Sequence, residues 1–153
     1  AKVFITDINQ DTLKTISAKY NAEVVSLDGI YDVDMDIYAP CALGATLNTE
    51  NIARLKCGVV SGAANNQLAD EFVHGPMLES KGILYAPDFL INAGGLINVY
   101  SELHGYDRKV AIQHTEAIYE TTLEVFRKAT TEKISTIEAA KKIAEERIAG
   151  SRQ

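Results

Sequence analysis

Residues 85–99 read YAPDFLINAGGLINV and give the clearest local signal in the chain. The apolar residues 83–85 predict a strand that ends at a Pro-Asp turn, and the glycines Gly94 and Gly95 predict the start of a helix. Glycines at a helix start let backbone N–H groups approach an anionic group such as a carboxylate. The amide of Asn92 can both donate and accept a hydrogen bond at the same place. The segment indicates either a ligand site between a strand and a helix or a plain tight turn.

Short apolar strands alternate with helices before this segment, and only helices follow it. Strands are expected at 3–5, 24–25, 35–39, 59–60 and 83–85. Helical segments are expected after Asp7 with Asn9 or Asp11 as the cap, and then at 27–31, 49–55, 72–79, 94–103, 107–129 and 135–149. This order predicts an α/β fold, with a doubly wound parallel sheet and a C-terminal helical extension. The runs at 3–5 and 35–39 are expected to be buried on both faces, as central parallel strands are.

Composition limits the classes of function. The chain has 153 residues, of which 46% are hydrophobic and 24% charged, values ordinary for a soluble globular protein with a real core. The formal net charge of −6 argues against nucleic acid or an anionic membrane surface as a partner. No apolar run reaches the length of about 18 residues that a membrane-spanning helix needs.

Cysteines and histidines predict neither a disulfide framework nor a metal site. Cys41 and Cys57 each adjoin an apolar strand segment and are expected to be buried free thiols, which fits a reducing cytoplasm. His74, His104 and His114 lack metal-ligand spacing, and we expect them to be partly exposed.

Four blocks in the chain resemble the amino-acid dehydrogenase family of glutamate, leucine, phenylalanine and valine dehydrogenases, and most closely its leucine-specific members. The blocks are 6–9 (TDIN), 36–45 (DIYAPCALGA), 62–68 (GAANNQL) and 85–98 (YAPDFLINAGGLIN). They occur in family order and cover roughly residues 1–110, which makes the resemblance far more specific than any single motif. The resemblance implies a Rossmann-like fold, NAD as the cofactor, an amino-acid substrate and a homo-oligomer.

The start of the chain predicts a fragment. Ala1 begins almost directly in a strand, and the Gly-rich phosphate loop of a dinucleotide fold would lie upstream of the ribose-binding acid. We therefore expect the N-terminal part of the parent fold to be missing. Residues 1–110 are expected to form a partial NAD-binding domain without its first strand, and 111–153 a set of helices packed on it or linking back from it.

Asp7 is the residue that predicts the choice of cofactor. An acidic residue at the end of the second strand of a dinucleotide fold hydrogen-bonds the adenosine ribose hydroxyls and repels a 2′-phosphate. Residues 8–10 contain no lysine or arginine to bind that phosphate, so NAD is favoured over NADP. The alternative is that Asp7 only caps the following helix.

The resemblance assigns the other site residues. It places Ile8, Cys41, Ala42, Ala64 and Asn65 with Asp7 around the cofactor. It places Asn92, Leu96 and Val99 around the substrate, and the two apolar side chains favour a branched aliphatic amino acid. The alternatives from sequence alone are turn residues at Asn65 and core residues at Leu96 and Val99.

The reaction implied is reversible oxidative deamination to a 2-oxo acid and ammonia. In the family the acid–base residues lie on an N-terminal domain, and no position here matches their motifs, so no catalytic residue is assigned in this chain. Three other functions stay open: an NAD-dependent dehydrogenase of the phenylalanine or valine type, a 2-hydroxy-acid dehydrogenase, for which His104 is the only candidate histidine, and a non-catalytic nucleotide-binding module.

Overall fold

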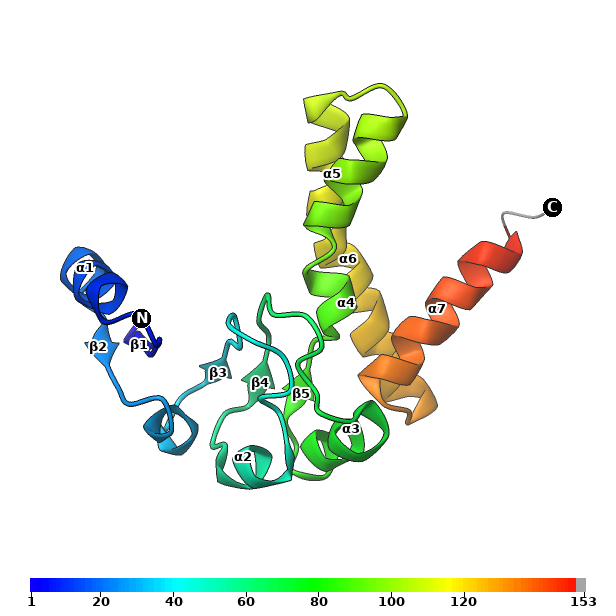
Figure 1. Cartoon of the computed structure of the whole chain (residues 1–153). Coiled ribbons are helices and arrows are strands. Elements are labelled where there is room, and N and C mark those ends of the chain that lie inside the picture. The colour runs from blue at the N-terminus through cyan, green and yellow to red at the C-terminus, as the bar shows by residue number, and fades with distance from the viewer. Residues whose placement is uncertain (151–153) are drawn as a thin grey trace.

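The computed structural model describes residues 1–150 (Figure 1). Its elements alternate as the sequence predicts and then become helical. They are β1 Phe4–Ile5, α1 Gln10–Tyr20, β2 Glu23–Val24, the 3-10 helix η1 Gly29–Asp32, β3 Ile37–Tyr38, α2 Thr49–Arg54, β4 Val59–Val60, α3 Glu71–Ser80, β5 Leu84–Tyr85, α4 Asp88–Ile91, α5 Gly94–Leu103, α6 Arg108–Glu132 and α7 Thr136–Gly150. The short helix α4 is the one element that the sequence did not predict. The last three residues of the predicted segment 111–153 lie outside the described part.

All strand pairs are parallel, which confirms the α/β class. They form two small sheets, one with the order β1-β2 and one with the order β3-β4-β5. The register pairs Phe4 with Glu23 in the first sheet, and Tyr38 with Val60 and Val60 with Tyr85 in the second. In Figure 1, β1, β2 and α1 lie on one side of the molecule, and β3 faces them as the edge of the other sheet.

The prediction that residues 3–5 and 35–39 are buried on both faces is wrong for this structure. Val3 is 45% exposed and Ile37 is 59% exposed. Val3 directly precedes β1 and Ile37 lies in β3, and both strands are edge strands, because β1 pairs only with β2 and β3 pairs only with β4 within residues 1–150. An edge strand has one neighbour, so its side chains gain less cover than those of a central strand.

The main core lies between the three-stranded sheet and α2 and α3. Leu47, Ile52, Val60 and Leu78 are fully buried in it. Ile137 of α7 joins the same core, where its Cδ1 would lie 3.0 Å from a Cβ built on Gly75. A second cluster, centred on Val125 and Ala139 to Ile143, joins α6 to α7. The C-terminal helices therefore pack on the sheet domain and on each other.

Side-chain caps explain where most of the helices begin. Asn9 accepts from two backbone N–H groups of α1, and Asn48 does so once for α2. Asp70 and Asp107 cap α3 and α6 in the same way. Gly82, with a φ of +71°, turns the chain after α3.

Arg54 fixes η1 against α2. Its guanidinium donates to carboxylate oxygens of Asp28 and Asp32 at 2.7 Å each and to the Asp28 carbonyl at 2.8 Å. These hydrogen bonds hold the pKa of both aspartates below the ordinary value. Because the folded-state pKa values are lowered, this contribution to stability is present above the ordinary pKa and is lost as the pH falls through the folded values.

The two cysteines differ in burial. Cys57 is buried as predicted, and burial raises the pKa of its thiol. Cys41 is exposed, so the prediction of a buried thiol is wrong there. It follows Pro40 in the loop after β3, where the chain has already left the sheet. None of the helices within residues 1–150 has the length and apolar character needed to cross a membrane.

Candidate functional site

Three loops meet at the carboxyl ends of β3, β4 and β5. The Ala64 N–H donates to the Pro40 carbonyl at 3.0 Å, and the Ala45 N–H donates to the Asn66 carbonyl at 2.7 Å. Gly44 allows this approach, since a Cβ there would lie 2.8 Å from the carbonyl oxygen of Asn66. Ligands in parallel α/β sheets bind at the carboxyl ends of the strands, so these loops mark the candidate site.

Two of the predicted site residues are in direct contact at this edge. The Asn92 Nδ2 donates to the Asn65 Oδ1 at 2.6 Å, although the residues are 27 positions apart. The bond leaves the Asn65 amide N–H groups and the Asn92 carbonyl oxygen available to a ligand. The pair can therefore offer donors and an acceptor side by side.

A groove of about 780 Å³ lies between β1 and β3 and continues into the loop after β3. Three predicted cofactor residues, Asp7, Cys41 and Ala42, line it together. Thr6 also lines the groove, and its buried Oγ1 has no hydrogen-bond partner within residues 1–150. This orphaned hydroxyl and the neighbouring carboxylate suit a ligand with hydroxyl groups, such as a ribose.

Asp7 is not the helix cap that the alternative interpretation required. The cap of α1 is Asn9, and the Asp7 Oδ1 accepts from the Asn9 N–H at 2.8 Å. The Asp7 Oδ2 accepts no hydrogen bond from residues 1–150, which leaves that oxygen to accept from a ligand hydroxyl. Ile8 is exposed and does not line the groove.

Leu96 and Val99 are surface residues in this structure. They lie on α5 just beyond Asn92, and their side chains are 74% and 53% exposed. The alternative that both are plain core residues is therefore wrong for this chain. Their apolar side chains are available to line a pocket whose other walls lie elsewhere.

Two residues of the site carry no assignment from the sequence. Gln67 is completely buried, and its Nε2 donates to the carbonyls of Gly62 at 2.5 Å and Ala64 at 2.9 Å. Asp88 accepts from the Gln67 N–H at 2.8 Å. Both residues belong to the four sequence blocks. Their hydrogen bonds to other loops, however, can be recognised only in the folded structure.

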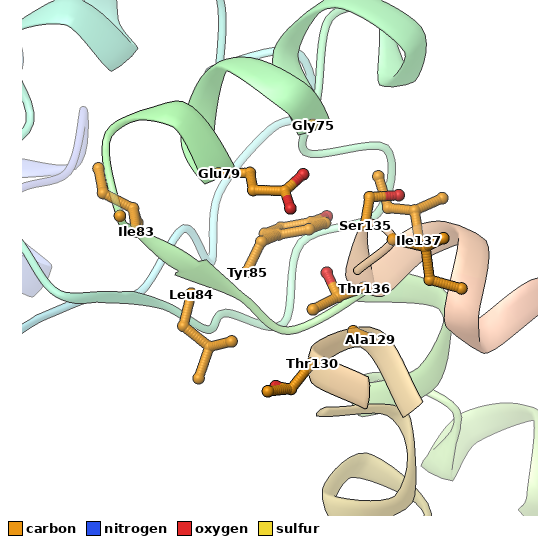
Figure 2. A pocket seen from close by; sticks show the side chains of 12 residues that line it. Gly75, Glu79, Ile83, Leu84, Tyr85, Ala129, Thr130, Ser135, Thr136 and Ile137 are labelled. Atoms are coloured by element: carbon orange, nitrogen blue, oxygen red, sulfur yellow. The ribbon is translucent and has the colours of Figure 1, made fainter. Parts of the chain in front are cut away.

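A second cavity, of about 230 Å³, lies at the start of β5 near the turn between α6 and α7. Figure 2 shows the side chains of Glu79 and Tyr85 at this cavity, together with those of Thr136 and Ile137 from α7. Burial and the nearby Asp88 raise the pKa of Tyr85, so its phenol stays protonated at neutral pH. None of the predicted site residues lines this cavity.

His104 and His74 each make contacts with neighbouring residues of the chain. His104 follows the last residue of α5, stacks on Tyr100 with ring centroids 4.2 Å apart, and lies at the opposite end of α5 from Asn92. His74 is buried, so the prediction of partial exposure is wrong for this residue. Both ring nitrogens have partners: Nδ1 accepts from the Asp70 N–H, and Nε2 contacts the Thr49 hydroxyl. No group of three metal-ligating side chains occurs in the part of the chain that the structure describes.

Comparison with known proteins identifies the family. The family described as Glutamate/Leucine/Phenylalanine/Valine dehydrogenase matches residues 2–153. This chain belongs to that dehydrogenase family. The resemblance inferred from the four blocks is thus confirmed over nearly the whole chain.

Several members of the family are close relatives. Leucine dehydrogenase of Thermoactinomyces intermedius is 54% identical over 148 residues, which are 97% of this chain and 40% of that protein. Phenylalanine dehydrogenase of Caldalkalibacillus thermarum is 42% identical over 97% of this chain and 41% of that protein. The chain thus spans about two fifths of the length of these dehydrogenases.

Solved structures of the family share the fold. The crystal structure of L-tryptophan dehydrogenase from Nostoc punctiforme matches with a TM-score of 0.96 and 44% identity, over 99% of this chain and 46% of that chain. A hetero-hexameric glutamate dehydrogenase from Thermus thermophilus matches with a TM-score of 0.66 and 18% identity, over 90% of this chain and 35% of that chain. The arrangement of strands and helices in this chain is therefore that of part of an amino-acid dehydrogenase.

Proposed function

We propose that this chain is the cofactor-binding part of an NAD-dependent dehydrogenase that deaminates branched-chain L-amino acids, namely leucine, isoleucine and valine. The contact between Asn65 and Asn92 carries the proposal, because it joins a predicted cofactor residue to a predicted substrate residue. The 54% identity with a leucine dehydrogenase supports the choice of substrate. The apolar, exposed Leu96 and Val99 support it as well.

Each residue has a defined task in this reaction. NAD would supply the hydride acceptor for the substrate Cα–H; loss of that hydride and of a proton from the amine gives an imine, which water hydrolyses to a 2-oxo acid and ammonia. Asp7 holds the adenosine ribose through its free carboxylate oxygen, and Cys41 and Ala42 line the adenosine side of the groove. Asn65 binds the nicotinamide ribose, and Asn92 orients the substrate beside it. Proton transfer belongs to residues of a further, N-terminal catalytic domain.

The fold proposal follows from the facing edges of the two sheets. Strands β1 and β3 each have one unpaired edge within residues 1–150, and the groove lies between them. One further parallel strand in the part of the groove between β1 and β3 would join them into a single doubly wound, Rossmann-like sheet, and would leave the end lined by Asp7, Cys41 and Ala42 to the cofactor. Residues 1–110 are then the partial NAD-binding domain, and 111–153 supply the helices that pack on it.

Cofactor choice gives the first test. The complete enzyme is expected to use NAD far more efficiently than NADP, because the Asp7 carboxylate repels a 2′-phosphate. Asp7→Ala should reduce the preference for NAD, measured by steady-state kinetics as the ratio of kcat/KM with NAD to kcat/KM with NADP. Asp11→Ala, which removes an exposed carboxylate from the first turn of α1, is the control and should leave the ratio unchanged. Equal use of NAD and NADP by the wild-type enzyme would contradict the assignment.

The isolated 153-residue chain is expected to be inactive. It carries the ribose-binding acid and the substrate amide, but no assigned acid–base residue. Purified chain mixed with leucine and NAD should therefore produce no NADH absorbance at any cofactor concentration. Turnover by material free of host dehydrogenases would show that the chemistry resides here.

Aromatic amino acids form the second candidate substrate class. The tryptophan dehydrogenase of Nostoc punctiforme is 45% identical over 99% of this chain, and a phenylalanine dehydrogenase is 42% identical. A panel of leucine, valine, phenylalanine and tryptophan separates the two classes. A 2-hydroxy-acid substrate is disfavoured by the position of His104 at the far end of α5.

Location and assembly are part of the same proposal. Two free cysteines suit the reducing cytoplasm, and the apolar side chains exposed along α5 suit contact with another domain or subunit. A homo-oligomer built on such contacts would show its size in sedimentation of the complete enzyme.

A further inference from the structure

Asp88 joins the two loops that carry the asparagine pair. Its Oδ2 accepts from the backbone N–H of Gln67, two residues after Asn65, at 2.8 Å. Its own carbonyl accepts from the Asn92 N–H at 3.0 Å. One residue is thus bonded to the loop after β4 and to the end of α4.

Asp88 is suited to this role because both of its carboxylate oxygens are used. Oδ1 accepts from the Phe89 N–H at 2.7 Å while Oδ2 binds the Gln67 N–H. An asparagine in its place has one acceptor and one donor, so its NH₂ group would face one of these two N–H donors. Hydrogen bonds to an ionised acceptor are also stronger than neutral ones.

The loop that Asp88 holds turns at Asn66. This residue has a φ of +51°, in the left-handed region that asparagine adopts more readily than most other non-glycine residues. The buried Gln67 side chain fixes the segment before it through the carbonyls of Gly62 and Ala64. The bond to Asp88 fixes the segment after it, so Asn65 is held from both sides.

We infer that Asp88 is a positioning residue, which sets the contact of Asn65 with Asn92 and thereby the alignment of cofactor and substrate. The inference rests on the proposed function for its catalytic consequence. The effect of Asp88 on the contact between Asn65 and Asn92 depends only on residues of this chain. Misplacement of reacting groups by about 1 Å can lower a rate by about 100-fold. Loss of the hydrogen bond from the Gln67 N–H to Asp88 should therefore have a measurable effect on kcat.

The test compares Asp88→Asn with wild type in the complete enzyme. Crystal structures should show the Asn65–Asn92 contact, 2.6 Å in the wild-type chain, lost in the variant. The kcat for leucine should fall by about 10- to 100-fold while the KM changes much less, because alignment rather than affinity is lost. Asp88→Glu keeps two carboxylate acceptors and should recover part of kcat. It also serves as the deciding variant if Asp88→Asn does not fold.

Asp107→Asn is the matched control, since Asp107 also accepts from backbone N–H groups at a helix start, at 2.7 Å from Lys109. It should leave both kcat and the asparagine contact unchanged. The inference is overturned if Asp88→Asn keeps the contact, or loses the contact with no greater fall in kcat than the control. A wild-type enzyme without activity on any amino acid would contradict the proposed function, while the crystal structures would still test the contact.

Discussion

Gly62→Ala is expected to destabilise the protein more than alanine at any other glycine of residues 1–150. A Cβ at this position would overlap the backbone N and O atoms of Pro40, which lie in the neighbouring loop. Backbone atoms cannot rotate away as a side chain does, so the loops after β3 and β4 must separate. Overpacking of this kind costs about 1–3 kcal/mol or more, and a fall in melting temperature on the order of 5–10 °C should follow.

The measurement is thermal unfolding followed by circular dichroism, with Gly95→Ala as the control. A Cβ at Gly95 meets nothing within 4 Å, and the residue lies in the first turn of α5. Alanine there should leave the melting temperature unchanged or raise it slightly, because alanine favours the helix. Equal melting temperatures for Gly62→Ala and wild type would mean that the two loops are not in close contact.

Val99→Ser is expected to have the largest effect on substrate choice. Val99 is 53% exposed on α5, so the substitution removes no core contact within this chain. If Val99 lines the substrate pocket, kcat/KM for leucine should fall roughly 10-fold or more, since lost apolar contact in such a pocket is worth about 1–3 kcal/mol. NAD binding should stay nearly constant, and smaller substrates should lose less because they fill less of the pocket.

Substrate comparison separates this effect from general damage. Steady-state kinetics of the complete enzyme with leucine, valine and alanine give the three ratios, and Leu103→Ser is the control. Leu103 is another exposed apolar residue of α5, one turn beyond Val99. An equal decline for all three substrates would indicate destabilisation and remove Val99 from the pocket.

The sequence predicted the order and type of nearly every element because those signals are local. The cap of α1, expected at Asn9 or Asp11 and found at Asn9, and the strand at Val59–Val60 each depend on residues only a few positions apart. The family membership was likewise available, since four blocks occur in order along the chain. The helix α4 was missed because it has only four residues, too few for the repeated spacing of apolar residues that identifies a helix in a sequence.

Burial and contacts between loops were decided by the tertiary structure alone. Whether Val3 and Ile37 are covered depends on which strand lies beside them, and no residue spacing contains that information. The hydrogen bonds from Asn92 to Asn65 and from Gln67 to Asp88 join residues more than 20 positions apart. In this chain these two contacts form where parallel strands end at one edge of a sheet. The sequence alone predicted most side chains of the candidate site, and the packing of three loops determined which of them touch.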